Sequence, residues 1–172
     1  KLVHHSSWVA TQLAQHPILL DELLDIEALY HPLNRTALEQ ALQQDMARVD
    51  EDDAEQVMEH LRQFKNAQVL RVAAADISEI LPVMRVSDQL TWIAEVILAI
   101  TWRHVWRMLA LKSGVPTYQM NQEQHESGFA IIGYGKLGGL ELGYGSDIDI
   151  IFLHNSEGER QVTNGDKPLE NG

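Results

Sequence analysis

Apolar residues recur every three to four positions over most of the chain before residue 114, a spacing that is typical of amphipathic helices. Within residues 8–30, Pro17 interrupts this pattern, because proline lacks an amide donor and clashes with the preceding turn of a helix. We therefore expect two short helices joined near His16, followed by a turn at residues 31–35. The apolar stripe of this region consists of Leu13, Leu19, Leu20, Leu23 and Leu24.

A second pair of helices is predicted on either side of an acidic run. Thr36 and Glu39 have the spacing of a capping box, which predicts a helix that continues to about Val49. Residues 50–55 (DEDDAE) begin a second helix of about 53–79, and the helix dipole favours acidic side chains at such an N-terminus. A metal site or a partner site is the alternative role of this acidic run.

The most apolar helix is predicted at about residues 88–113, with Ser87 as its N-cap after a break at Leu81–Pro82. Because this helix is apolar around much of its circumference, we expect it to lie centrally. Its tryptophans are able to stack on a nucleotide base, but their aliphatic neighbours favour core packing. These residues are Trp92, Trp102 and Trp106.

Two later apolar runs, Phe129–Ile132 and Ile148–Leu153, predict buried β-strands because they are rich in β-branched and aromatic residues. The polar stretch 114–127 is predicted to be a linker into this region, and a turn with six glycines connects the two runs. After His154 the sequence becomes polar, which predicts a mobile surface loop at 155–172 with no further strand or helix.

Two carboxylates, Asp147 and Asp149, stand at the beginning of the second predicted strand. Residues two apart on a strand share a face, so both carboxylates are expected on one side while Ile148 and Ile150 point into the core. Such like charges repel each other, and a divalent cation would remove the repulsion; hard oxygen ligands suit Mg²⁺. The alternative is that Asp147 is only a polar residue at the strand entry and Asp149 is solvated.

The glycine-rich turn before the aspartates has the composition of a phosphate-binding loop. Glycine accepts backbone conformations with positive φ, which allow several N–H groups to converge on phosphate oxygens. Lys136 supplies the one positive charge between Phe129 and His154. Together with the aspartates, these residues predict a site for a triphosphate and a metal. The eight histidines are scattered, and we assign none of them to a metal.

Composition narrows the class of substrate. The chain has 172 residues, a net charge of −12 and no cysteine. The acidic balance argues against a nucleic-acid binder, which needs a basic surface to displace counterions from phosphates. The absence of cysteine excludes disulfides and thiolate metal sites. No apolar run is long enough to cross a membrane, and no signal peptide is recognisable, so we expect a cytoplasmic protein.

The glycine turn and the aspartates resemble the nucleotidyltransferase superfamily of DNA polymerase beta. Gly135-Lys136, ten intervening residues and Asp147-Ile148-Asp149-Ile150 match that signature, except that Lys136 stands where serine or glycine is usual. The string GYGKLGGLELGYGSDIDIIFLH is similar to the glutamine synthetase adenylyltransferase/adenylyl-removing enzymes, and its details resemble the C-terminal, adenylylating copy of the domain. HPILLDELLD, LRQFKNAQVLRVAAADI and LPVMRVSDQLTWIAE extend the resemblance over nearly the whole chain.

This resemblance implies an α+β fold, mostly α, with a helical region at 1–127 and the incomplete start of a nucleotidyltransferase sheet at 128–172. It implies Mg²⁺-dependent transfer of AMP from ATP to a tyrosine hydroxyl of glutamine synthetase, which regulates nitrogen assimilation. A third carboxylate would come from a later segment. The implied partners are glutamine synthetase and the PII signal protein, with no nucleic acid and no membrane. The implied catalytic and metal residues are Asp147 and Asp149, and the implied nucleotide-binding residues are Gly135, Lys136, Gly138, Gly139 and Ser146.

Two alternatives remain open at the level of sequence. Phosphorolytic removal of AMP from adenylylated glutamine synthetase would need the same metal pair. A helical interaction module without activity of its own would leave Asp147 and Asp149 as the margin of a neighbouring domain.

Overall fold

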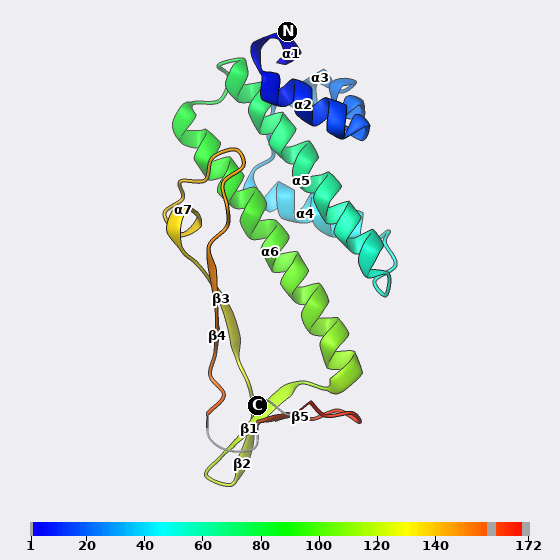
Figure 1. The fold of residues 1–172 in the computed structure, drawn as a ribbon, viewed down its shortest axis with the longest axis vertical. Helices are drawn as coiled ribbons and strands as arrows, with labels where there is room; N and C mark the ends of the chain where they lie inside the picture. Colours follow the sequence, from blue (N-terminus) through cyan, green and yellow to red (C-terminus); the bar gives the residue numbers. More distant parts are fainter. Residues whose placement is uncertain (1, 158–160, 170–172) are drawn as a thin grey trace. The chain divides into compact units, whose positions relative to one another are not determined.

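The computed structural model describes residues 2–157 and 161–169 and divides the chain into two compact units (Figure 1). The helical unit contains residues 1–99 and 139–147, and the strand unit contains residues 100–138 and 148–172. The expectation of an α+β chain that is mostly α is confirmed.

The helical unit is built from several short helices, one long helix and the first part of another. These elements are α1 (Leu2–His5), α2 (Ser7–Gln15), the 3₁₀ helix η1 (Pro17–Leu23), α3 (Ile26–Tyr30), α4 (Arg35–Met46), α5 (Ala54–Ile77) and the first part of α6 (Val83–Ser113).

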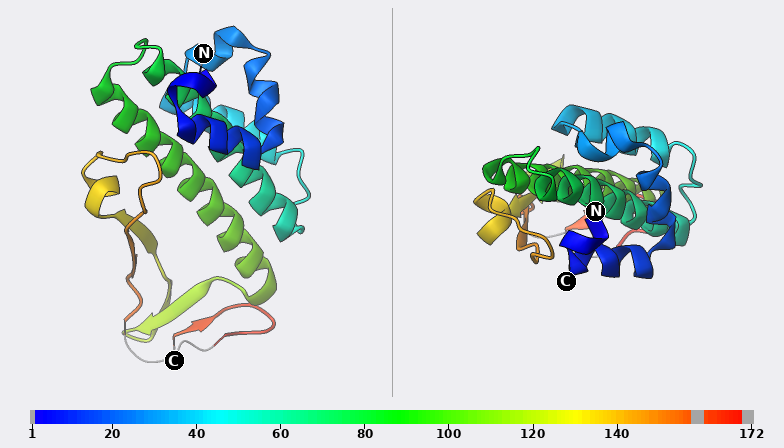
Figure 2. Two further views of the ribbon diagram at one scale, coloured as in Figure 1. Left: turned by 45° about the horizontal axis from the view of Figure 1, so that its top comes forward. Right: turned by 90° about the horizontal axis from the view of Figure 1, so that it is seen from above.

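The main hydrophobic cluster of this unit forms where α2, η1 and α3 lie against α5, as Figure 2 shows for the blue and teal helices. Its buried members are Val9, Leu13, Leu19, Leu29, Leu70, Ala73 and Ala74. The alanines of α5 allow a close approach of the neighbouring helices, and an ion pair of 2.7 Å between Arg71 and Glu22 joins α5 to η1 beside the cluster. Burial of these apolar side chains supplies the main favourable term for this unit.

The break at His16–Pro17 is confirmed, because α2 ends at Gln15 and Pro17 begins η1. The capping residue of α4 was predicted incorrectly. Asn34 caps this helix by accepting a hydrogen bond of 3.0 Å from the Ala37 N–H, so Thr36 already lies inside the helix. Asn34 lies in the stretch 31–35 that was expected to be a turn, and asparagine is at least as strong a cap as threonine.

The acidic run does begin a helix, as expected. Asp53 accepts hydrogen bonds from the N–H groups of Glu55 and Gln56, at 3.1 and 3.0 Å, and thereby caps α5. Ser87 as the cap of the last helix is wrong, because α6 begins at Val83, directly after Pro82. The fixed φ of proline is favourable at a helix start, and this starts the helix one turn earlier than the serine would.

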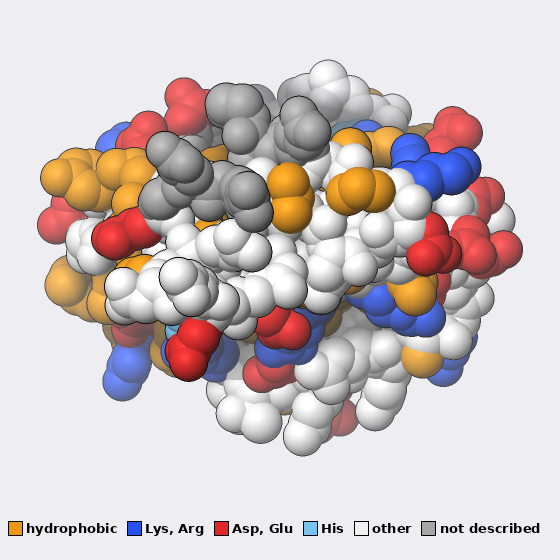
Figure 3. All heavy atoms as spheres, turned by 90° about the horizontal axis from the view of Figure 1, so that it is seen from below, with side chains coloured by type: hydrophobic (Ala, Val, Ile, Leu, Met, Phe, Trp, Pro, Cys, Tyr) orange, Lys and Arg blue, Asp and Glu red, His pale blue; other side chains and the backbone are white. Residues whose placement is uncertain are grey.

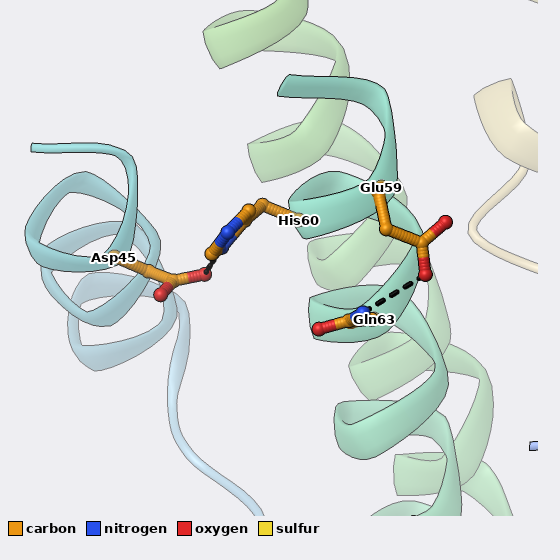
Figure 4. A network of polar contacts seen from close by, with 4 residues as sticks. All are labelled: Asp45, Glu59, His60 and Gln63. Atoms are coloured by element: carbon orange, nitrogen blue, oxygen red, sulfur yellow. Dashed lines mark hydrogen bonds and ion pairs between the residues drawn. The ribbon is translucent and has the colours of Figure 1, made fainter. Parts of the chain in front are cut away.

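A polar network connects α4 to α5 and runs along α5 (Figure 4). His60 Nδ1 lies 3.3 Å from Asp45 Oδ2, and Gln63 Nε2 donates a hydrogen bond of 2.9 Å to Glu59. The hydrogen bond from Gln63, followed by the hydrogen bond and charge of Arg62, lowers the pKa of Glu59. These residues are partly exposed, and the contact between His60 and Asp45 joins α4 to α5.

The strand unit contains two small antiparallel sheets, of order β2-β1-β5 and β3-β4. The strands are β1 (Pro116–Met120), β2 (Glu123–Glu126), β3 (Phe129–Gly133), β4 (Ile150–His154) and β5 (Val162–Thr163). A single helical turn, α7 (Gly135–Gly138), follows β3.

The predicted linker at 114–127 is wrong, since β1 and β2 form a hairpin there. Asn121 and Gln122 connect the strands with φ of 52° and 69°, which are the left-handed conformations of a type I′ turn. The polar loop expected after His154 also contains a strand, because Val162 and Thr163 pair with β1. Residues 158–160 and 170–172 of that predicted loop lie outside the described residues.

The two strands expected around the glycine turn exist, but they are not buried. In β4 the exposed fractions of Ile151 and Phe152 are 45% and 58%, and Phe129 of β3 is 36% exposed. Apolar composition predicts burial only when a second layer covers the sheet. Within the strand unit, the half-buried Trp102 of α6 stacks on Phe129 with ring centroids 4.3 Å apart.

The described residues contain no helix that is both long and apolar enough to cross a membrane. On the face that Figure 3 shows, the coloured side chains mix acidic and basic groups, and the described residues form no continuous basic surface there. This agrees with the net charge of −12.

Candidate active site

The glycine turn places the backbone of Asp149 beside the end of β3. The Tyr134 N–H donates a hydrogen bond of 2.8 Å to the Asp149 carbonyl, and the Gly138 N–H donates one of 3.0 Å to the Tyr134 carbonyl. The chain therefore closes one helical turn directly after the strand and meets the residue that precedes β4. Leu137, only 6% exposed, fixes this turn and lies against Gly133.

Gly135 is required both by its conformation and by the approach of Asp149. Its φ is +51°, which disfavours any residue with a side chain. A Cβ at this position would collide with the Asp149 carboxylate, whose Oδ2 and Cγ lie directly over the glycine. Gly138 is constrained as well, since a Cβ there would come within 2.6 Å of the Gly133 carbonyl. Glycine at position 135 therefore leaves room for the Asp149 carboxylate, and glycine at position 138 leaves room for the Gly133 carbonyl.

Lys136 lies next to Gly135 on α7 and is exposed, as is Asp149. Hence four of the predicted site residues, Gly135, Lys136, Gly138 and Asp149, come together in the strand unit. They combine backbone N–H groups, an ammonium group and a carboxylate within one short stretch. This is the donor set that a metal-bound polyphosphate needs.

The other predicted residues, Gly139, Ser146 and Asp147, belong to the helical unit. Ser146 closes a tight turn, in which its N–H donates to the Gly143 carbonyl at 3.1 Å and its Oγ accepts from the Gly143 N–H at 3.0 Å. Gly145 has a φ of +71°, as the third position of a type II turn requires. Asp147 follows this turn and is exposed.

Asp147 and Asp149 both precede β4, which begins at Ile150 and not at Ile148. Alternation along a strand therefore does not determine where their carboxylates point, and Ile148 is 43% exposed rather than buried. The shared orientation of the two carboxylates stays a prediction.

Tyr144 is a residue of this segment to which sequence analysis assigned no structural role. Its hydroxyl donates a hydrogen bond of 3.0 Å to Asp76 Oδ2 on α5, and its ring lies against Trp8 with centroids 5.3 Å apart. Burial, followed by the hydrogen bond to Asp76 and the Asp76 charge, raises the pKa of Tyr144. A tyrosine between glycines carries no periodic signal, so a pattern of apolar positions does not find it.

The described residues contain no group of three or more acidic, histidine or cysteine side chains that would enclose a metal. Mg²⁺ does not need such an enclosure, because it is usually bound by one or two carboxylates together with water and substrate phosphates. The exposed carboxylate over Gly135 fits this mode of binding. A structural cation held only by protein ligands would not fit it.

Comparison with known proteins identifies the family. The family model of glutamate-ammonia ligase adenylyltransferase matches residues 1–172. A protein of Thioalkalivibrio sulfidiphilus is 55% identical over 171 residues, which are 99% of this chain and 18% of the relative. A Shewanella oneidensis protein is 50% identical over 97% of the chain, and a Shewanella loihica protein is 48% identical over 97%; each match also spans 18% of the relative.

All three relatives bear the name bifunctional glutamine synthetase adenylyltransferase/adenylyl-removing enzyme. The matched residues include the helices, the glycine turn and the segment that contains both aspartates. The chain therefore belongs to the glutamate-ammonia ligase adenylyltransferase family, and it spans 18% of the length of these relatives.

Proposed function

We propose that this chain contributes the nucleotide- and metal-binding segment of an adenylyltransferase that moves AMP from ATP to a tyrosine hydroxyl of glutamine synthetase. The observation that carries the proposal is the Asp149 carboxylate held against Gly135, the residue that directly precedes Lys136 in the chain. The names of the relatives supply the substrate protein, and the sequence motif supplies the class of reaction.

The proposed roles follow from the chemistry of each group. Asp147 and Asp149 are the residues that would hold Mg²⁺, and the ion would supply positive charge to neutralise the phosphates. Lys136 and the backbone N–H groups of Gly135, Gly138 and Gly139 hold the triphosphate, and Ser146 is a further donor.

The proposed reaction is a single displacement at the α-phosphorus of ATP. The phenolic oxygen of the acceptor tyrosine forms a bond to the α-phosphorus of ATP, the bond to the bridging oxygen breaks, and pyrophosphate leaves. The proton of the tyrosine is lost in the same step. We assign no residue of this chain as the base that accepts it, and the resemblance implies a third carboxylate from a later segment.

Glutamine synthetase is the proposed acceptor because the relatives are named for acting on it. The PII signal protein is a proposed regulatory partner on the ground of the family resemblance alone. A nucleic-acid substrate does not fit the net charge of −12.

The test is transfer of labelled AMP from ATP to glutamine synthetase by the full-length protein. Asp147→Asn and Asp149→Asn keep the size of the side chain but remove the charge that binds Mg²⁺, so each is expected to lower the rate by a factor of about 100 or more. Glu141→Gln is the matched control, because Glu141 is an exposed acid of the same segment. Normal transfer by Asp147→Asn would rule out the proposed metal pair.

Removal of AMP is a second candidate, since the relatives carry both activities in their name. Assaying the same variants for phosphorolysis tests whether this segment serves removal instead: phosphate attacks the phosphorus of the AMP group on glutamine synthetase, the bond to the tyrosine oxygen breaks, and ADP is released. A third candidate is a helical interaction module, which the large share of helix in the chain favours. Mg²⁺-dependent ATP binding that Asp149→Asn abolishes would contradict that candidate.

A further inference from the structure

Within the helical unit, the segment 139–147 contacts α5 through the side chain of Tyr144. Tyr144 donates a hydrogen bond of 3.0 Å to Asp76, and its ring lies against Trp8. It also packs against the main hydrophobic cluster of this unit. Leu142, two residues earlier, is only 4% exposed. The segment 139–147 is thus anchored by two buried or half-buried side chains, although it has no regular secondary structure.

Asp76 lies at a position of α5 that is unfavourable for a carboxylate. Asp76 lies in the last turn of α5, which ends at Ile77. A carboxylate near a helix C-terminus is unfavourable, because it lies beside the negative end of the helix dipole. The hydrogen bond from Tyr144 gives this carboxylate a partner at that position and accounts for an acid there.

A hydrogen-bonded turn connects Tyr144 to Asp147. Tyr144 and Gly145 are the central residues of the turn that two hydrogen bonds close between Gly143 and Ser146. Asp147 follows Ser146 directly. Fixing the Tyr144 side chain therefore restricts the backbone that carries the Asp147 carboxylate.

We propose that Tyr144 is a positioning residue, which together with Asp76 and Trp8 holds Asp147 and Ser146 in the conformation that binds Mg²⁺ and the nucleotide. This inference rests on the proposed function of Asp147. It adds a role for the helical unit, which would fix the backbone of Asp147.

The test uses the full-length protein with Tyr144→Phe, which removes the hydrogen bond but keeps the ring. Three quantities are measured: amide hydrogen exchange of the peptide that covers 139–147, direct binding of Mn²⁺ as a paramagnetic substitute for Mg²⁺, and the dependence of the transfer rate on Mg²⁺. Tyr30→Phe is the matched control, because Tyr30 packs against the same hydrophobic cluster from α3.

For Tyr144→Phe we expect about fivefold faster exchange in 139–147, the factor for one lost hydrogen bond, and a similar loss of Mn²⁺ affinity. Excess Mg²⁺ is expected to restore the rate, while the KM for glutamine synthetase stays unchanged. Asp76→Ala should reproduce these effects, and Asp76→Asn should reproduce them only weakly, since its amide oxygen still accepts the hydrogen bond. Combining Tyr144→Phe with Asp76→Ala should add nothing further.

Unchanged exchange and unchanged Mn²⁺ affinity in Tyr144→Phe would overturn the inference, and so would equal effects of Tyr30→Phe. A loss of rate that excess Mg²⁺ does not restore would also overturn it, because the defect would then lie elsewhere. These results are distinct from failure of the proposed function, which is decided by whether Asp147→Asn retains transfer.

Discussion

At the scale of single residues, the structure explains why glycine is needed at two positions of the candidate site. Composition identified Gly135 and Gly138 as parts of a flexible turn, and the structure gives each a specific constraint, a carboxylate over Gly135 and a carbonyl beside Gly138. Tyr144 was beyond sequence analysis, because its partners Asp76 and Trp8 lie 68 and 136 positions away in the chain. Contacts between such distant positions leave no periodic pattern in one sequence.

The substitution Gly135→Ala tests a single residue of the candidate site, and we expect it to slow the transfer of AMP. The methyl group would be forced into a conformation with positive φ, at a cost of about 1–2 kcal/mol, and it would displace the Asp149 carboxylate. We expect transfer to fall at least tenfold, measured with labelled ATP. Asn121→Ala serves as control, because Asn121 also has a positive φ, 52°, but lies in the β1–β2 hairpin. Equal losses in both variants would point to general instability instead.

At the scale of elements, several helices could be predicted from the sequence. Whether another layer of the protein covers the strands could not. The 3.6-residue period and Pro17 located α2, α4 and α5 because helix formation depends on neighbours within a few positions. Burial of β3 and β4 was inferred from their composition, which does not reveal whether another layer covers them. The β1–β2 hairpin was missed since Asn121-Gln122 lacks the glycine that usually marks a type I′ turn.

The capping of α4 gives a prediction at the same scale. Asn34→Ala should lower the free energy of unfolding by about 1 kcal/mol, because the Ala37 N–H loses its acceptor. Thr36→Ala should change it by less than about 0.5 kcal/mol, since Thr36 is an exposed residue inside the helix. Urea unfolding followed by circular dichroism measures both. A larger effect for Thr36→Ala would show that the capping box forms in solution after all.

At the scale of the whole molecule, alkaline pH tests the raised pKa of Tyr144. Burial and the neighbouring Asp76 disfavour the phenolate in the folded state, whereas the unfolded chain ionises near the ordinary value of 10. Below pH 10 the phenol is protonated in both states and its contribution is complete. Above pH 10 the unfolded state releases this proton first, so the free energy of unfolding falls as the pH rises.

Tyr144→Phe has no proton to release at this position, and its free energy of unfolding should therefore fall less steeply between pH 9 and 11. Urea midpoints across this range compare the variant with the unchanged protein, and Tyr30→Phe corrects for the loss of one ordinary tyrosine. Because all other tyrosines and lysines titrate in every variant, only the difference in slope reports on Tyr144. If the free energy of unfolding fell equally steeply with pH in Tyr144→Phe and in the unchanged protein, the contact of Tyr144 with Asp76 would not persist in solution. The proposal that Tyr144 positions Asp147 would then lose its main observation.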